Sequence, residues 1–588
     1  MPGEASFRMT ARTPTGRPLA VEERVSPGGA PTEAKSRTAS WLGAAAAALL
    51  GMAVVWHVFG GHVLPPSHTG WMLTGTIGPD PVQYWLGFTF FKRSPWMWPP
   101  GLNPAYGLEL GSSIFYADSI PLLAFAFKAL HPAVEVSQYW GLWLFACGAL
   151  QGALAWKLLG LATRDPLARL AGSALFVMQP TLLNRMGGHF ALSAHFLILA
   201  GLWLCLARGE GPRRTVAWAL LVLLTSLIHS YILPMVLGLW AADWLARAAE
   251  RRPLPPLAAE ALAVPASGLA GLWAAGFFVL RSGHGGGGAR FGEMQLDLLA
   301  PFDPSFWGAF LPDLPGPDHL EVGSSYAGLG ILLLLAIAGV AWLRRPLRGL
   351  RARWPLLLAL FGMLAVAITH RVSIGGWQIT LFELPPALVE PAAALRASER
   401  FLWPLAYALL VAAMAVLAHG IGGRRAGLVL LALVAVQFAD LQPGFARLDR
   451  FFPVGPAVAP LRLSDPFWAE AARHYKRIRV TPNGNLARNW EEAAVYAATL
   501  GLESDGVYLA RIDPARVQAL NAEMAARLAE GRYEPETFYA LGDEASVERA
   551  RRGMDPSRDL LARYNGVWVL APDWWPLTGR APPPPAER

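Results

Sequence analysis

Residues 41–60, WLGAAAAALLGMAVVWHVFG, decide the fold class of this chain, because the run contains no Asp, Glu, Lys or Arg. A helix of about twenty apolar residues is long enough to cross the hydrocarbon core of a membrane. Residues 1–40 are rich in Pro, Gly, Ser, Thr and Arg without apolar periodicity, so we expect a disordered tail before this helix. That basic segment is too long for a secretory signal, and no small-x-small cleavage site follows the run. We therefore expect residues 41–60 to be an uncleaved membrane anchor.

Further apolar runs follow along most of the chain. They lie near residues 133–156, 169–184, 189–207, 215–230, 231–247, 257–280, 326–343, 354–369, 401–418 and 426–442. The chain of 588 residues is 54% hydrophobic and 16% charged, whereas soluble domains carry about 25% charged residues. The sequence therefore predicts a multi-spanning α-helical membrane protein, with about eleven transmembrane helices between residues 41 and 443. The least distinct boundary is His229-Ser230-Tyr231, which alone separates two of the runs.

The positive charge lies in the N-terminal tail and in alternate loops. The most basic loop holds Arg344, Arg345, Arg348, Arg351 and Arg353. Because cytoplasmic loops carry the excess of Lys and Arg, we expect the N-terminus in the cytoplasm. An odd number of spans then places the C-terminus outside, together with the long outer loops 61–132 and 281–325. The same placement accounts for the net charge of +8, so we expect membrane lipids as partners and no nucleic acid.

Residues 444–580 have the composition of a soluble domain. Helical stretches near 466–476, 489–500, 514–530 and 543–553 alternate with strand-like runs. The strand-like runs are Arg477–Val480, Val507–Arg511, Phe538–Leu541 and Val567–Leu570. Such alternation predicts an extracytoplasmic α/β domain with partly parallel strands. The last residues, 581–588, are expected to be a disordered tail.

Several common enzyme motifs are missing from the sequence, which has no Walker motif, dinucleotide fingerprint, HExxH or CxxC array. Cys147 and Cys205 lie in apolar runs, so neither a disulfide framework nor a cysteine metal site is supported. The glycine run 285–288 is not followed by Lys and Ser or Thr, which favours a flexible hinge over a phosphate-binding loop. An enzyme outside the membrane has no ATP or nucleotide sugar, and would need a substrate already activated and carried by lipid.

The outer loop 61–132 holds two carboxylates, Asp80 and Asp118. Asp80 precedes a proline, and an Asp-Pro pair is typical of a helix N-cap followed by a first-turn proline. A helix starting there would place Asp80, Gln83 and Tyr84 on one face. Capping and a chemical role both stay open for Asp80, while for Asp118 capping of the short helix that follows is favoured. As chemical groups, the two acids would be a base and its orienter, or ligands of a metal.

Basic side chains stand at the predicted outer ends of two spans. His189 is suited to bind phosphate or metal, although a histidine without a chemical role is commoner at such positions. His195 does not share its helix face, so a two-histidine metal motif is unsupported. Arg396 and Arg400 enter a span from the side where arginine is disfavoured. An ion pair with Glu399 or lipid phosphate would explain them, but we favour an anion site for a phosphorylated lipid, because guanidinium matches phosphate in geometry and charge.

Five stretches resemble polytopic glycosyltransferases of the GT-C superfamily, and more narrowly an uncharacterised bacterial family of multi-spanning proteins thought to belong there. They are Asp80–Trp98, Gly107–Pro121, Gly187–His195, Tyr326–Gly330 and Arg396–Tyr407. The resemblance implies a catalytic acid early in the first outer loop, where Asp80 lies, and a second acid near its end, where Asp118 lies. It also implies an arginine near a late span that contacts the lipid phosphate, matched first by Arg400 and second by Arg396.

The tryptophan-tryptophan-aspartate signature of oligosaccharyltransferases is missing, because Trp574-Trp575 is preceded and not followed by Asp573. Protein N-glycosylation is therefore not expected.

Together, the residues and the resemblance imply an inverting glycosyltransferase at the bacterial inner membrane. It would move a sugar from a polyprenyl-phosphate carrier to an acceptor of the cell envelope in the periplasm. The expected catalytic residues are Asp80 and Asp118, and the expected substrate-binding residues are Gln83, Tyr84, His189, Arg396 and Arg400. A divalent cation on the two acids stays open, as do the sugar, the acceptor and the oligomeric state. A transporter or flippase for a lipid-linked saccharide, and a non-catalytic assembly subunit, are the alternatives.

Overall fold

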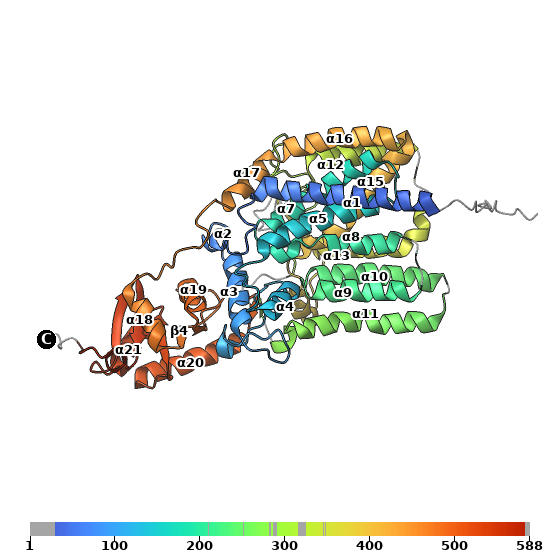
Figure 1. Ribbon diagram of the computed structural model, residues 1–588. Helices are drawn as coiled ribbons and strands as arrows, with labels where there is room; N and C mark the ends of the chain where they lie inside the picture. Colours follow the sequence, from blue (N-terminus) through green and yellow to red (C-terminus); the bar gives the residue numbers. More distant parts are fainter. Residues whose placement is uncertain are drawn as a thin grey trace, which may run out of the picture. The chain divides into compact units, whose positions relative to one another are not determined.

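Every predicted apolar run forms a helix in the computed structural model, and Figure 1 shows the long helices running in a common direction. They are α1 (Ala30–Phe59), α5 (Trp140–Leu159), α6 (Pro166–Val177), α8 (Phe196–Leu206), α9 (Pro212–Ser226), α10 (Ile232–Ala249), α11 (Leu254–Ala274), α12 (Leu329–Arg344), α13 (Trp354–Ile368), α15 (Trp403–Ile421) and α16 (Gly423–Asp440). The structure describes all residues except 1–29, 208, 210, 251, 281–283, 286–290, 315–324, 345, 347–348 and 583–588.

Among the described helices, six are long and apolar enough to cross a membrane: α1, α5, α10, α11, α13 and α15, the last two with the short 3-10 turns that precede them. The number is seven if α16 and α17 (Gln442–Phe451), which meet at a 51° bend, count as one span. The prediction of about eleven spans is too high by this criterion. The run 169–184 is broken because α6 ends at Val177 and α7 (Pro180–Met186) begins at a proline, which cannot donate a backbone hydrogen bond. The helices α8, α9 and α12 are likewise too short.

Helix α1 begins at Ala30, before Trp41, where the predicted membrane anchor starts. Residues 1–29 of the predicted N-terminal tail, the predicted C-terminal tail from residue 583 and glycines 286–288 lie outside the described residues. Residues 44–588 form one compact unit.

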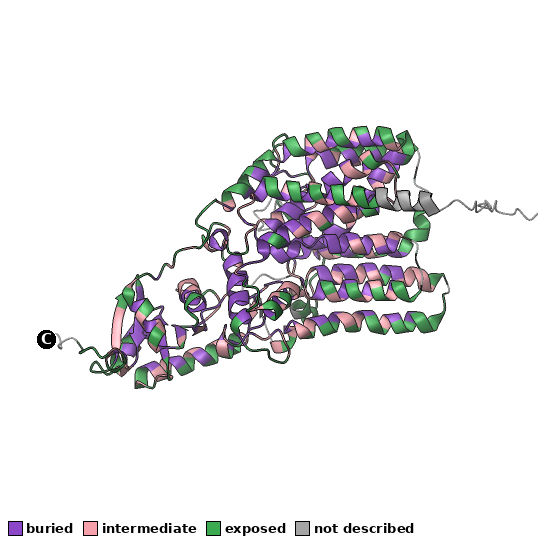
Figure 2. Cartoon of the chain, viewed as in Figure 1, coloured by how far each residue is buried: buried purple, intermediate pink, exposed green. Residues whose placement is uncertain are grey.

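The long helices expose apolar side chains on one face. In Figure 2 buried and exposed residues alternate along α11 and α16. Leu262, Leu269, Phe361 and Leu428 are all more than half exposed. Large apolar faces of this kind are unusual on soluble proteins, and they fit helices that contact lipid. By contrast, α3 (Asp80–Arg93) is buried along almost its whole length.

Helix α3 packs directly on the turn 116–119 of the same outer loop. A Cβ atom at Gly87 would lie 2.3 Å from the Cβ of Ala117, so a larger residue would force the two segments apart. The Ser119 hydroxyl donates a hydrogen bond to the Tyr84 carbonyl at 2.8 Å. These contacts hold Asp118 close to the helix that begins with Asp80.

The C-terminal domain contains a five-stranded mixed sheet in the order β5-β4-β7-β9-β8. Its strands are β4 (Arg477–Thr481), β5 (Glu503–Ser504), β7 (Thr537–Leu541), β8 (Leu560–Tyr564) and β9 (Val567–Ala571). Its helices are α18 (Pro466–His474), α19 (Trp490–Leu500), α20 (Pro514–Glu530), α21 (Glu544–Gly553) and α22 (Trp574–Thr578). The strand β4 is parallel to β5 and β7, while β9 is antiparallel to β7 and β8. The predicted helices, the partly parallel sheet and three of the four predicted strands are confirmed.

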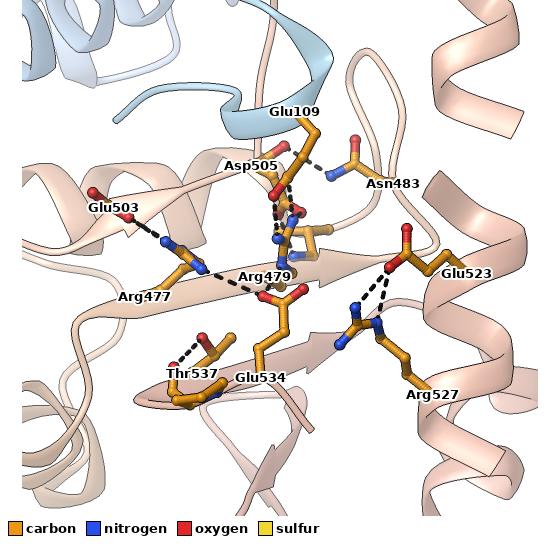
Figure 3. A network of polar contacts seen from close by, with 12 residues as sticks. Glu109, Arg477, Arg479, Asn483, Glu503, Asp505, Glu523, Arg527, Glu534 and Thr537 are labelled. Atoms are coloured by element: carbon orange, nitrogen blue, oxygen red, sulfur yellow. Dashed lines mark hydrogen bonds and ion pairs between the residues drawn. The ribbon is translucent and has the colours of Figure 1, made fainter. Parts of the chain in front are cut away.

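Arg479 on β4 connects this sheet to the outer loop, as Figure 3 shows. Its guanidinium is 1% exposed and donates two hydrogen bonds of 2.8 Å to the carboxylate of Glu109, in the short 3-10 helix Leu108–Leu110. It also donates to Asp505 at 3.0 Å and to Glu534 at 2.7 Å. A buried arginine stabilises a fold only if its hydrogen-bonding groups are satisfied, and here three carboxylates satisfy them. The pKa of Glu109 is lowered by the hydrogen bonds from Arg479.

Residues 504–512, which we call the strap, begin at the last residue of β5 and then run along the outer loop, outside the main sheet. The Ser504 amide donates to the Ala105 carbonyl at 3.1 Å, and the Ala510 amide donates to the Tyr116 carbonyl at 2.8 Å. The strap ends in β6 (Arg511–Ile512), which pairs with β1 (His284–Gly285). The predicted strand over residues 507–511 was therefore wrong, because these residues find most of their backbone partners outside the sheet.

We expect Gly87→Ala to lower the free energy of unfolding by about 1–3 kcal/mol, because the added methyl group overpacks the contact with the 116–119 turn. Thermal unfolding in detergent measures this. Gly339→Ala in α12 is the matched control, since nothing lies within 4 Å of its Cβ position, and it should be neutral or stabilising. Equal melting temperatures for wild type and Gly87→Ala would contradict the close packing.

Candidate functional site

Asp80 and Asp118 face the same cluster of polar side chains at the ends of the apolar helices. The Asp80 carboxylate lies 3.4 Å from Nε2 of His189. The Asp118 carboxylate lies 3.8 Å from Nε2 of His229. Each acid also contributes to the electrostatic environment of the Tyr84 hydroxyl, and Arg400 acts on it with the opposite sign. The structure thus brings together five of the seven site residues predicted from the sequence, with Arg396 at the edge of the cluster.

Asp80 does not cap a helix. The N-cap position of α3 is Pro79, and Asp80 is the first helical residue. Three other Asp-Pro pairs of the chain behave differently, since the side chains of Asp165, Asp465 and Asp513 each accept a hydrogen bond from the first turn of the following helix. Of the two roles left open for Asp80, capping is therefore not supported.

Asp118 does not cap the following helix either, so the favoured prediction for this residue was wrong. Helix α4 (Pro121–Leu130) has Ile120 at its N-cap position, and no side chain caps it. Asp118 has a φ of 51°, in the left-handed region where L-residues are uncommon and Asp is among the better tolerated. Its carboxylate lies against His229 and close to Arg400.

The side chain of Asp118 favours its protonated form. Its pKa is raised to about 8, first by burial and then by the negative charge of Asp80. The positive charge of Arg400 and a hydrogen bond from the Tyr84 side chain oppose this shift without cancelling it. A protonated carboxyl can donate a hydrogen bond, which an ionised one cannot. The two acids of the outer loop are therefore suited to different tasks.

His229 holds its proton on the nitrogen that faces Asp118. The Tyr231 amide donates to Nδ1 of His229 at 3.0 Å, so the neutral ring carries its hydrogen on Nε2. The pKa of His229 is lowered well below its usual value, first by burial and then by the positive charges of Arg400, His189 and Arg185. The sequence reasoning missed this residue, although the polar break at His229-Ser230-Tyr231 between two apolar runs was visible.

Arg400 supplies the positive charge of the cluster from a 3-10 turn, Ser398–Leu402, that leads into α15. Its guanidinium carbon lies 4.8 Å from the centre of the Tyr231 ring, a cation–π contact. The side chain is 8% exposed, so its charge acts in a poorly hydrated environment. Arg396 is half-buried and its charge opposes the rise in the pKa of Tyr508.

Tyr508 reaches the cluster from the strap, and no feature of the sequence predicted a role for this residue in the site. Its side chain is hydrogen-bonded with Asp80, and its pKa is raised by burial and by the charge of Asp80. The backbone around it is held on both sides. The Tyr508 amide donates to the Tyr106 hydroxyl at 3.3 Å, and the Leu509 amide donates to Oδ1 of Asn485 at 2.8 Å.

Gln83 plays a different part from the one predicted. Its amide is buried and donates to the Tyr116 carbonyl at 3.0 Å, so it holds the turn beside Asp118 instead of facing the carboxylates. His195 is fully buried, with Nδ1 2.8 Å from the Tyr407 hydroxyl, and is a core histidine.

Across the described parts of the chain, no three His, Cys, Asp or Glu side chains are grouped so that they could hold a metal ion. A cation on Asp80 and Asp118 would need further ligands from water or substrate.

Two family profiles cover these segments. Residues 48–442 match the family described as Domain of unknown function (DUF6311), and residues 467–572 match the DUF6311 C-terminal domain. The chain belongs to the DUF6311 family. The DUF6311 match contains both acids and Arg400, while the strap with Tyr508 lies in the DUF6311 C-terminal match. A search of curated proteins found no match to this DUF6311 chain.

We expect Asp118→Asn to remove a pH dependence of stability. The pKa of Asp118 is about 8 in the folded protein, whereas an Asp in an unfolded chain has its ordinary pKa of 3.8. The free energy of unfolding therefore falls as pH rises from about 4 to 8, and Asp118→Asn lacks this pH dependence. As pH rises from 5 to 8 in detergent, the melting temperature of Asp118→Asn should rise relative to that of the wild type. A constant difference over that range would contradict a protonated Asp118.

Proposed function

We propose that this DUF6311 protein is an inverting glycosyltransferase of GT-C type, which transfers a sugar from a polyprenyl-phosphate carrier to an acceptor outside a bacterial inner membrane. One observation carries the proposal. Two carboxyl groups, Asp80 and Asp118, lie near the buried Arg400 at the ends of apolar helices. That combination offers a base, a hydrogen-bond donor and an anion site where a lipid headgroup would lie.

In the proposed reaction the Asp80 carboxylate takes the proton of an acceptor hydroxyl. The acceptor oxygen forms a bond to C1 of the sugar while the bond from C1 to the carrier phosphate breaks. Attack from the face opposite the leaving group inverts the configuration at C1. The leaving phosphate gains negative charge as this bond breaks, and Arg400 stabilises that charge in a site of low dielectric. The atoms balance without a further reactant.

Asp118 and His229 then act as neutral donors. The carboxyl of Asp118 and Nε2 of His229 both present hydrogens inside the cluster, which suits the orientation of sugar or phosphate oxygens. His189 and Tyr508 flank Asp80 and would fix the direction of its carboxylate. If a divalent cation takes part, Asp80 and the substrate phosphate are the groups to hold it.

We also propose that the C-terminal domain is periplasmic and the N-terminus cytoplasmic. The contact of Arg479 with Glu109 supports this, since it requires the domain and the first outer loop to share one side of the helices. A count of seven spans, which takes α16 and α17 as one span, is odd and would place the chain ends on opposite sides, whereas a count of six would not.

Asp80→Asn should reduce transfer by about a hundred- to ten-thousand-fold, because an amide cannot accept the proton. Asp165→Asn is the matched control. It alters the same Asp-Pro dipeptide at a helix start, where Asn caps as well as Asp, and it should leave activity intact. The assay follows transfer in membranes supplied with polyprenyl-phosphate-linked sugars, with thermal unfolding as the check on folding.

The outcomes separate the candidate functions. A folded Asp80→Asn protein with full transfer would refute the catalytic role of Asp80. If wild-type vesicles move the lipid-linked sugar across the bilayer without forming a new glycosidic bond, the protein is a transporter and not a transferase.

Arg400→Ala should lower transfer by about a hundred- to a thousand-fold through loss of charge stabilisation at the phosphate. Arg400→Lys should recover only part, because ammonium cannot form the bidentate fork. Arg462→Ala, which removes an exposed surface arginine of the C-terminal domain, is the control. Unchanged activity with saturating and limiting donor in folded Arg400→Ala would remove this residue from the site.

A further inference from the structure

The hairpin formed by β2 (Arg371–Ile374) and β3 (Trp377–Thr380) has its apolar face turned outward. Its register pairs Ile374 with Trp377 and Val372 with Ile379, so these four apolar side chains share one face. The opposite face carries only polar side chains. They are Arg371, Ser373, Gln378 and Thr380.

The polar face of the hairpin is attached to the rest of the protein through β2, while the side chains of β3 are exposed. The Ser373 hydroxyl donates to Asp297 at 2.6 Å and is fully buried. The Gly375 amide donates to the same carboxylate at 3.1 Å, and the Leu298 amide donates to the Ser373 carbonyl at 2.9 Å. The hairpin is thus fixed in place, and Trp377 remains 80% exposed. This reverses the usual pattern, in which an antiparallel sheet turns its apolar face inward.

The chain around the hairpin extends the apolar surface. Large exposed apolar side chains occur throughout the segment. They are Ile374, Trp377, Ile379, Leu381, Phe382, Leu388 and Val389. The last two belong to α14 (Pro386–Ala393). A cluster of this kind marks contact with an apolar partner or with a membrane.

The position of the hairpin in the chain favours a membrane over an apolar partner. It begins three residues after Ile368, the last residue of one candidate span, and the next candidate span begins at Ser398. Three extended residues reach about 10 Å, so the base of the hairpin lies near the end of an apolar helix. The headgroup region on each side of a bilayer is about 5–8 Å thick. The hairpin is therefore at the right level to meet lipid.

We propose that residues 371–389 lie on the outer leaflet of the membrane, with the apolar face of the hairpin among the lipid acyl chains. Its backbone stays at headgroup level, because a two-stranded hairpin has unpaired edge groups that hydrocarbon would not satisfy. A tryptophan beside the turn is the residue type that favours this interface. The choice of the outer leaflet rests on the topology proposed above, but contact of the hairpin with lipid holds for any activity of the chain.

Site-directed spin labelling in lipid nanodiscs tests this placement. Trp377→Cys and Ile379→Cys put a label on the apolar face, and Gln378→Cys puts one on the polar face of the same strand. Phe361→Cys, on the exposed side of α13, reports lipid, and Lys476→Cys in the C-terminal domain reports water. The native Cys147 and Cys205 are buried, which leaves the introduced thiol as the labelling site.

The measured quantity at each label is the ratio of its collision rate with oxygen to its collision rate with a water-soluble nickel complex. This ratio should be several-fold higher at positions 377 and 379 than at position 476. The label at position 378 should show a smaller ratio. If positions 377 and 379 match position 476 while position 361 reports lipid, the face lies in water and the proposal fails. Labels shielded from both reagents would mean that protein covers the face, which also overturns it. Should Trp377→Cys not fold, Ile374→Cys provides the same measurement.

Discussion

The absence of a side chain at position 87 allows the backbone of α3 to approach the 116–119 turn more closely than any other residue would permit. The relative position of the two acids depends on this contact. Hydrogen bonds from Gln83 and Ser119 then fix the register between helix and turn. The strap binds the same turn through Tyr116, so the C-terminal domain is positioned by the segment that positions the acids. One close backbone contact thus organises the loop, the domain and the site.

The electrostatics of the cluster follow from its burial. Burial raises the pKa of Asp118 above its usual value, and the negative charge of Asp80 adds to the rise. Burial lowers the pKa of His229, and the positive charge of Arg400 disfavours its protonation further. Arg400 therefore brings a positive charge to a cluster in which Asp118 and His229 favour their neutral forms. Such a site favours an anionic ligand over a cationic one.

Local sequence signals predicted much of the fold. Apolar runs located the long helices of the membrane-like part, and alternation located most of the C-terminal domain, because both depend on periodicity within one element. Contacts between distant segments left no such signal. Residues 507–511 have strand propensity, but partners in the outer loop satisfy it, and Tyr508 was missed as a result. The Asp-Pro pairs at Asp165, Asp465 and Asp513 do cap helices in the structure, whereas tertiary packing gives Asp80 another environment.

The hydrogen bonds between Tyr106 and Tyr508 join positions 402 residues apart in the chain. Proteins are made from the N-terminus, so both acids and Arg400 leave the ribosome long before the strap does. The cluster consequently stays open on one side until residues 504–512 have been translated and have folded against the loop. Assembly of the site is thereby coupled to synthesis of the C-terminal domain, and a product arrested before residue 504 would lack the segment that carries Tyr508.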